Sequence, residues 1–227
     1  YMVLILTGGG NGEDTKEIDK YFASLIDKSK PLLYLPIAID TIKHPYPECL
    51  KWLRQTFDKL GISKYEMITE ETLSQYSDKS PNDYGGIYIG GGNTPYLLKN
   101  IKESEMIKFI NEAVEQNIPI YGGSAGAIIF GKTIKSSLKA DRNRVKLTDF
   151  TGLNKVNGWD IWCHYTPEHN IMISEFLTKN KDIEKLIVLS EKNAIIVNQK
   201  DIQVIGQEPA IAISSTFRKT INVGEKI

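Results

Sequence analysis

Residues 120–129, IYGGSAGAII, form an apolar run that breaks at two glycines, presents one serine and continues through small residues into apolar ones. Such a run predicts a buried strand that turns abruptly into a helix. Gly122, Ser124 and Gly126 fit the pattern Gly-x-Ser-x-Gly, in which a sharp strand-to-helix turn lifts a serine hydroxyl out of a sheet. The pattern predicts that Ser124 is a nucleophile and that the N–H of Ala125 points toward the group it attacks.

A second motif overlaps the first, because residues 126–133, GAIIFGKT, spell the phosphate-binding pattern G-x-x-x-x-G-K-T. A phosphate-binding loop wraps its backbone amides around phosphate oxygens, so its interior residues face solvent. The interior residues here, 127–130, are apolar and favour a buried helix. The residues therefore favour a serine nucleophile over nucleotide binding.

The first two thirds of the chain alternate short apolar runs with amphipathic stretches. The predicted strands are residues 2–7, 31–39, 64–68, 85–92 and 118–124, and the predicted helices are residues 13–28, 47–61 and 103–117. Near-continuous apolar strands separated by helices are typical of a parallel sheet covered on both faces. After about residue 183, short strands joined by polar turns predict an antiparallel hairpin that finishes the sheet. The sequence contains no recognisable linker or repeat, so we expect residues 1–227 to form one α/β domain.

Composition narrows the classes of partner. Lys+Arg and Asp+Glu both number 28, so the chain lacks the basic surplus that nucleic-acid and anionic-membrane binding usually needs. No apolar run is long enough to span a bilayer, and the first one is too short for a signal segment. We expect a cytoplasmic protein in which both cysteines, Cys49 and Cys163, are structural thiols.

A serine nucleophile needs a base, and only three histidines exist to supply one. His44 lies among prolines in an expected loop, and His169 lies at an expected helix start on the surface. His164 is the better base because it follows an apolar run, where a strand meets a loop. Strand alternation then turns Cys163 away from the site, into the packing.

The carboxylate that orients the base cannot be chosen from residue chemistry alone. Asp160 lies four residues before His164 on an expected strand, roughly 13 Å away, and is out of reach. Asp141, Asp149 and Glu191 stay open at this point.

Three glycine clusters fall at expected carboxyl ends of strands, where α/β sheets bind ligands. They are residues 8–10, 90–92 and 122–123. For residues 8–10 we expect only a tight turn, because Glu13 stands where the third glycine of a dinucleotide fingerprint would be.

Three stretches together resemble the serine peptidase family of dipeptidase E and cyanophycinase: IGGGNTPYLLKNI at 89–101, GGSAGAIIF at 122–130 and IWCHYTPE at 161–168. The similarity extends from the first strand through residues 190–197, SEKNAIIV, and so covers most of the chain. It implies a three-layer α/β sandwich with a mostly parallel sheet. The fold would be flavodoxin-like and similar to class I glutamine amidotransferases, with serine where those enzymes carry cysteine.

The resemblance also implies roles. Ser124 matches the family nucleophile and His164 its base, and the stretch 132–141 matches the segment that ends in the triad aspartate, here Asp141. Glu191 matches another acid near the family's site and ranks second.

For substrate binding, the resemblance implies that the Gly92 N–H joins that of Ala125 in the oxyanion hole, with Asn93 beside them. Dipeptidase E is expected to hold an aspartyl carboxylate through an arginine after the histidine. Residues 167–177 contain neither Arg nor Lys, whereas residues 131–149 contain six Lys or Arg against two Asp.

We therefore expect a serine peptidase that cleaves short peptides, Asp-X dipeptides among them, through a Ser-His-Asp triad and an acyl-enzyme. The alternatives are a cyanophycinase-like isoaspartyl peptidase and a catalytically inactive binding module on the same fold. A short peptide is the expected partner, nucleic acid and membranes are not, and a homodimer is left open. No cofactor or metal is expected, because the three scattered histidines give no zinc-binding spacing.

Overall fold

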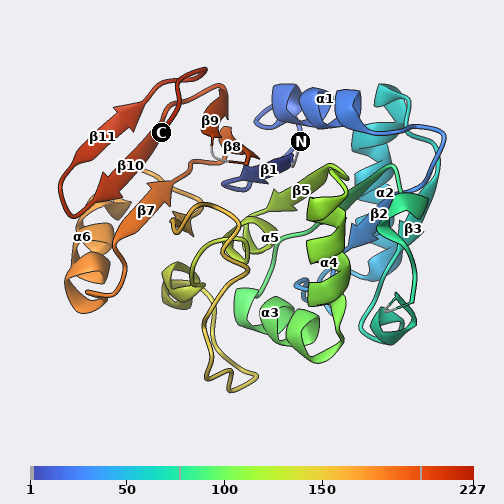
Figure 1. Cartoon of the computed structure of the whole chain (residues 1–227), viewed down its shortest axis with the longest axis horizontal. Coiled ribbons are helices and arrows are strands. Elements are labelled where there is room, and N and C mark those ends of the chain that lie inside the picture. The colour runs from blue at the N-terminus through green and yellow to red at the C-terminus, as the bar shows by residue number, and fades with distance from the viewer. Residues whose placement is uncertain (1–2, 77, 200) are drawn as a thin grey trace.

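The computed structural model describes residues 3–76, 78–199 and 201–227, and its strands form two sheets. The larger sheet has the order β3-β2-β4-β5-β1-β8-β9, and the smaller has the order β11-β10-β7-β6. Figure 1 shows the smaller sheet and α6 at the C-terminal side of the molecule, with the helices α1 to α4 gathered around the larger sheet.

The larger sheet has a parallel core of five strands. These are β1 (Leu4–Thr7), β2 (Leu32–Leu35), β3 (Tyr65–Met67), β4 (Gly86–Ile89) and β5 (Ile120–Gly123). The antiparallel hairpin of β8 (Asn193–Asn198) and β9 (Asp201–Gly206) completes it beside β1. The predicted α/β class, the mostly parallel sheet and the C-terminal hairpin are confirmed. The predicted first strand began at Met2, which lies outside the described residues.

The smaller sheet was not anticipated. It contains β6 (Asp160–Trp162), β7 (Lys185–Val188), β10 (Ala210–Ser214) and β11 (Arg218–Ile221). We expected the late strands to finish the first sheet, but β7 and β10 pair with each other and β7 pairs in parallel with β6. The hairpin of β8 and β9 already occupies the position beside β1 in the larger sheet. The strands β6, β7, β10 and β11 therefore form a separate sheet.

Helices cover both faces of the larger sheet. They are α1 (Lys16–Leu25), α2 (Tyr46–Phe57), α3 (Thr94–Glu103), α4 (Met106–Glu115), α5 (Ala125–Ile128) and α6 (His169–Lys179), with 3-10 turns η1 (Asp58–Leu60), η2 (Leu73–Tyr76), η3 (Pro81–Asp83) and η4 (Lys135–Lys139). The helix α3 was not predicted from the sequence. Its signal is Asn93-Thr94-Pro95, because the Asn93 Oδ1 accepts from the Tyr96 N–H and caps the helix. No helix in the described ranges is long and apolar enough to cross a membrane.

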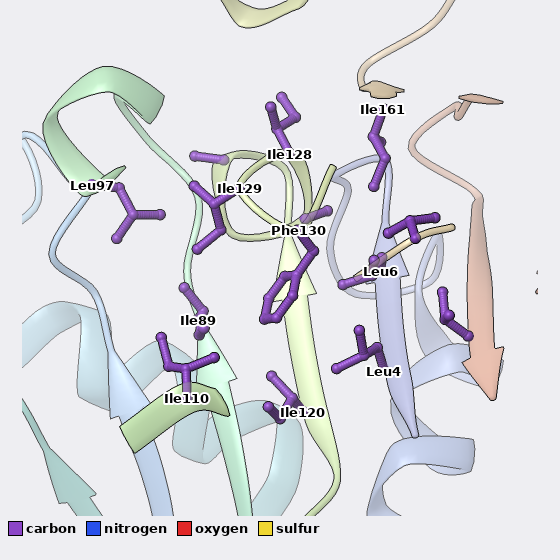
Figure 2. Close-up of a cluster of buried hydrophobic side chains, with 14 of the residues drawn as sticks. Leu4, Leu6, Ile89, Leu97, Ile110, Ile120, Ile128, Ile129, Phe130 and Ile161 are labelled. Carbon is purple, nitrogen blue, oxygen red and sulfur yellow. The ribbon is translucent and has the colours of Figure 1, made fainter. Parts of the chain in front are cut away.

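One continuous hydrophobic core joins the two sheets. Phe130 is fully buried, and Figure 2 shows its ring among Leu4, Leu6, Ile89 and Ile120. The same cluster includes residues of β6, β7 and β10 in the smaller sheet. Burying a side chain of this size contributes about 1.5–3 kcal/mol to stability. A single domain over residues 1–227 stays a prediction, which the shared core supports.

The opposite face of the sheet buries a carboxylic acid. Asp19 on α1 accepts hydrogen bonds from the Thr15 Oγ1 at 2.8 Å and from the Tyr121 hydroxyl at 3.0 Å. The ring of Phe22 packs edge-on against Tyr121, at 5.3 Å between centroids, and helps to exclude water. Burial raises the pKa of Asp19 from 3.8 to about 6, against the lowering effect of both hydrogen bonds.

The raised pKa of Asp19 predicts a pH-dependent stability. The folded state binds a proton that the unfolded chain releases, so the free energy of unfolding falls as pH rises from about 4 to about 6. Asparagine does not titrate, so the Asp19→Asn variant does not lose free energy of unfolding over this pH range. We expect its advantage over the wild type to grow from near zero at pH 4 to about 3 kcal/mol at most above pH 7. Urea unfolding at a series of pH values measures it, with Asp78→Asn as the exposed control. A constant difference across this range would contradict the prediction.

Candidate active site

Ser124 occupies a strained turn between β5 and α5. Its backbone has φ 51° and ψ −109°, outside the regions that non-glycine residues favour. The turn is held from both sides: the Ser124 N–H donates to the Thr7 carbonyl at 3.2 Å, and the Ser124 carbonyl accepts from the N–H groups of Ala127 and Ile128. The predicted change from strand to helix at this serine is confirmed.

The outer glycines of Gly-x-Ser-x-Gly are required by close backbone contact. A Cβ on Gly122 would lie 2.4 Å from the Gly126 carbonyl oxygen, and a Cβ on Gly126 would lie 2.2 Å from the Ile89 oxygen. Gly123 is different, because the nearest atom to its Cβ would be the Tyr88 hydroxyl at 3.6 Å. The motif therefore lets strand, helix and the neighbouring β4 meet at van der Waals distance.

The overlapping phosphate-loop pattern has no corresponding structure. Ile129 and Phe130 are fully buried, and Ile128 is 5% exposed. The Lys132 ammonium lies 3.9 Å from the Glu184 carboxylate, and the Lys132 N–H donates to the Trp159 carbonyl. The interior of the pattern packs into the core, as its apolar residues predict, and it leaves no loop open to phosphate.

His164 contacts the serine and an acid at once. Its Nε2 lies 2.8 Å from the Ser124 Oγ, and its Nδ1 lies 2.7 Å from the Glu191 Oε1. A carboxylate can only accept, so the neutral ring carries its proton on Nδ1 and leaves Nε2 free to accept from the serine hydroxyl. The predicted pairing of Ser124 with His164 is present, and the acid on the far nitrogen is Glu191.

The smaller sheet brings His164 and Glu191 together. Strands β6 and β7 run in parallel with Trp162 opposite Val188, and the pairing continues past their ends. The Leu189 N–H donates to the Trp162 carbonyl at 2.8 Å, and the Tyr165 N–H donates to the Leu189 carbonyl at 2.9 Å. Because the carboxyl ends of parallel strands lie at the same edge, the residues just beyond them become neighbours.

Gly8, Gly9 and Gly10 form a contact surface for this pair, beyond the tight turn expected for them. A Cβ on Gly9 would lie 2.3 Å from the His164 Cε1, and a Cβ on Gly10 would lie 2.2 Å from the Glu191 carbonyl oxygen. Gly8 also accepts a 2.8 Å hydrogen bond from the His164 N–H. The loop after β1 thus fixes the imidazole from behind, a role that the sequence interpretation missed.

Asp141 does not contact His164 in the structure, contrary to the expectation from the resemblance. Its Oδ2 accepts from the Thr94 N–H at 2.9 Å and from the Thr94 Oγ1 at 2.6 Å, at the first turn of α3. A carboxylate is favourable there because the free N–H groups of a helix start carry partial positive charge. Two other acids are also engaged elsewhere: Asp149 with Lys102 and Asp160 with Thr133.

The expected oxyanion donors are backbone groups without internal acceptors. The N–H groups of Gly92 and Ala125 donate to no acceptor among the described residues. Gly92 has φ 133°, and a Cβ there would lie 2.0 Å from the Ala38 carbonyl oxygen. Asn93 makes two side-chain hydrogen bonds, since its Oδ1 caps α3 and one N–H of its Nδ2 donates to the Arg142 carbonyl at 2.9 Å. Its amide therefore links the start of α3 to the loop that contains Arg142, and its role in substrate binding stays a prediction.

A cavity of about 400 Å³ opens at the nucleophile, which we call the serine cavity. Its lining includes Ser124, His164, Gly92, Asp141, Lys139 and Trp162. Of the cationic residues at 131–149, only Lys139 lines this cavity, whereas Lys135 pairs with Asp182. The Cys163 thiol is buried at its edge, and burial raises the pKa of that thiol, which agrees with a packing role. No group of three His, Cys, Asp or Glu side chains in the described ranges is arranged to bind a metal.

Comparison with known proteins identifies relatives of the chain. The sequence profile of peptidase family S51 matches residues 4–205. The chain belongs to peptidase family S51. It is 30% identical over 200 residues to peptidase E of Shewanella sp. (strain W3-18-1), covering 78% of this chain and 83% of the relative. It is 27% identical over 202 residues to peptidase E of Nostoc sp., covering 85% and 78%.

Solved structures share the fold of this S51 family member. A peptidase from an acI-B1 Actinobacterium superimposes with a TM-score of 0.72 at 19% identity, covering 99% of this chain and 96% of that one. A candidate peptidase E protein from Listeria monocytogenes EGD-e gives 0.70 at 21% identity, covering 91% and 98%. Family membership makes the chain a serine-type peptidase, a hydrolase of peptide bonds.

The two adjacent glycines before Ser124 offer a matched test of the turn. Gly122→Ala places a methyl 2.4 Å from the Gly126 carbonyl oxygen, whereas Gly123→Ala meets nothing closer than 3.6 Å. We expect Gly122→Ala to lower the free energy of unfolding by about 1–3 kcal/mol and Gly123→Ala to change it far less. Thermal and urea unfolding measure both. Equal losses at the two positions would mean that backbone contact does not select the glycine.

Proposed function

We propose that this S51 peptidase hydrolyses short peptides through a Ser124–His164–Glu191 triad and an acyl-enzyme. One observation carries the proposal: an unbroken chain of short contacts runs from the serine hydroxyl through both imidazole nitrogens to a carboxylate. A base within hydrogen-bond reach of the serine, itself oriented by a third group, is the arrangement that activates a serine hydroxyl.

The chemistry follows from these positions. His164 Nε2 removes the hydroxyl proton while the Ser124 Oγ attacks the carbonyl carbon, and the N–H groups of Gly92 and Ala125 stabilise the oxyanion. Loss of one such donor raises the barrier by roughly 3 kcal/mol. His164 then returns the proton to the leaving amine, which breaks the C–N bond, and water deacylates the serine by the same steps.

Glu191 and Asp141 take different roles in this proposal. Glu191 holds the His164 proton on Nδ1 and stabilises the imidazolium that forms, although both side chains are about half exposed. Asp141 acts through Thr94 by fixing the start of α3, which begins two residues after Gly92, the glycine that supplies the oxyanion N–H. Asp141 is therefore a positioning residue here.

One positive charge at the serine cavity is available to an acidic substrate, because the Asp141 carboxylate in the same lining accepts hydrogen bonds from Thr94. Lys139 lines that cavity and forms no ion pair with another described residue, so its ammonium is available to a substrate carboxylate. Peptides that begin with aspartate, joined through the α- or the β-carboxyl group, fit this charge. A cytoplasmic location and a homodimer stay predictions.

The kinetics of dipeptide hydrolysis distinguish the proposed role of Glu191 from that of Asp141. We expect Glu191→Gln to lower kcat/KM by roughly 10²-fold or more, because the imidazolium loses its charged partner. Asp141→Asn keeps an oxygen that accepts from Thr94, so we expect a loss below about 10-fold. Circular dichroism checks that both variants fold. If Asp141→Asn abolishes turnover and Glu191→Gln does not, Asp141 orients His164 and the proposed triad is incorrect.

Lys139 provides the corresponding test of substrate charge. We expect Lys139→Ala to raise KM for Asp-Leu by about 5- to 20-fold and to leave KM for Ala-Leu nearly unchanged, because only the first substrate offers an extra carboxylate. Lys146→Ala, an exposed lysine that does not line the cavity, is the matched control. Running β-Asp-Leu beside Asp-Leu distinguishes the isoaspartyl alternative. An equal rise in KM for Ala-Leu would remove Lys139 from substrate recognition.

A further inference from the structure

A second cavity, of about 470 Å³, lies at the carboxyl ends of β2 and β4 and beside α2, and we call it the aromatic cavity. Three rings line it, those of Tyr34, Trp52 and Tyr88, together with the apolar Pro36 and Ile39. Its volume lies in the range of pockets that bind small ligands, roughly 300–1,000 Å³. None of the steps proposed for Ser124 and His164 uses it.

The aromatic cavity adjoins the nucleophile through Gly91. Gly90 and Gly91 line the cavity, and a Cβ on Gly91 would lie 3.2 Å from the Ser124 Cβ and 3.8 Å from its Oγ. The two cavities lie toward opposite faces of the larger sheet. Tyr34 and Tyr88 belong to the core cluster beneath α1 and α2, whereas Ile128 of the serine cavity belongs to the cluster on the other face.

This placement suits a peptide that lies across the carboxyl ends of the strands at Ser124. The two residues that flank a scissile bond have Cα atoms about 3.8 Å apart, and in an extended chain their side chains point to opposite sides. With the bond at Ser124, one side chain would enter the serine cavity and the other would extend toward the aromatic cavity past Gly91. Any side chain at position 91 would narrow that passage.

The walls of the aromatic cavity are rigid and favour an aromatic guest. Tyr88 stacks on Tyr121 at 4.5 Å between ring centroids and meets Phe57, Tyr34 and Trp52 edge-on at 5.8, 5.6 and 6.1 Å. A further ring can add offset or edge-to-face contacts to such a set, each worth more than its buried area alone. Trp52 is 37% exposed, so part of its side chain is open to contact.

Charge at the aromatic cavity disfavours acidic guests. Glu48 lines it, is exposed, and forms no ion pair with another described residue. Its charge is opposite in sign to that of Lys139 in the serine cavity. Glu48 therefore disfavours an acidic side chain in the aromatic cavity and does not repel an uncharged ring.

We propose that the aromatic cavity is a specificity subsite that takes an aromatic side chain of the peptide substrate, from the residue next to the scissile bond. The inference deepens the proposed peptidase function and rests on it for the position of that bond. Trp52 and Tyr88 are the residues that would select the ring.

The test compares dipeptides that differ only in one side chain. Ala-Ala, Ala-Phe, Phe-Ala, Ala-Lys and Lys-Ala are assayed with the wild type. At one of the two positions we expect phenylalanine to exceed alanine in kcat/KM by about 10-fold or more, and to exceed lysine. Trp52→Ala should reduce the Phe-to-Ala ratio of kcat/KM about 3- to 10-fold.

Two further variants control this result. Lys51→Ala changes the neighbouring residue of α2, which does not line the aromatic cavity, and should leave the ratio intact. Ile39→Trp fills the cavity from another lining position and should lower the ratio even if Trp52→Ala folds poorly. A lysine preference, or a ratio that neither Trp52→Ala nor Ile39→Trp changes, would overturn the inference.

Calorimetric binding of the same dipeptides to Ser124→Ala separates the subsite from catalysis. If the wild type cleaves none of them but Ser124→Ala binds the Phe dipeptides more tightly than Ala-Ala, and Trp52→Ala in that background removes the difference, the proposed activity fails and the subsite stands. If the wild type cleaves Ala-Ala but Ser124→Ala binds all five equally, the activity stands and the subsite fails.

Discussion

The left-handed backbone at Ser124 is the constraint on which the rest of the site depends. A non-glycine residue in such a sparsely populated conformation carries about 1–3 kcal/mol of strain, so the surrounding structure must hold it there. The Thr7 carbonyl and the first turn of α5 do so through hydrogen bonds. The close contacts at Gly122 and Gly126 let β4, β5 and α5 converge on the same point. The Ser124 hydroxyl therefore lies at the carboxyl end of β5, within hydrogen-bond distance of the His164 Nε2.

The proposed catalytic groups come from two different sheets, so the contact between the sheets is as important as the turn. The serine belongs to the larger sheet, whereas the histidine and glutamate follow β6 and β7 of the smaller one. The glycines after β1 connect them: Gly8 binds the His164 N–H, and Gly9 lies against the imidazole. Larger residues at 8–10 would push the base and its acid away from the nucleophile. The cluster therefore has a role in geometry beyond that of an ordinary turn.

The parts predicted from the sequence were those with local signals. The Gly-x-Ser-x-Gly turn, the alternation of strands and helices and the position of His164 each depend on neighbouring residues. The acid beside His164 depends on the parallel register of β6 and β7, strands that are more than twenty residues apart in a sheet the sequence analysis did not foresee. Asp141 was favoured because its segment resembled the family's, yet its side chain caps α3 through Thr94. Residue chemistry had left Glu191 open, and only tertiary pairing distinguishes the two.

Covalent labelling by a fluorophosphonate probe shows whether Ser124 is an activated nucleophile, because the probe reacts with serines that a base has activated. Peptide mapping locates the adduct, and Ser136 and Ser137, which line the same cavity, serve as internal controls. Both of their hydroxyls donate to backbone carbonyls and are buried, so we expect them to stay unlabelled. We expect one adduct, on Ser124, that disappears in Ser124→Ala and forms much more slowly in His164→Ala. An unlabelled Ser124, or an adduct on Ser136 or Ser137, would contradict this expectation.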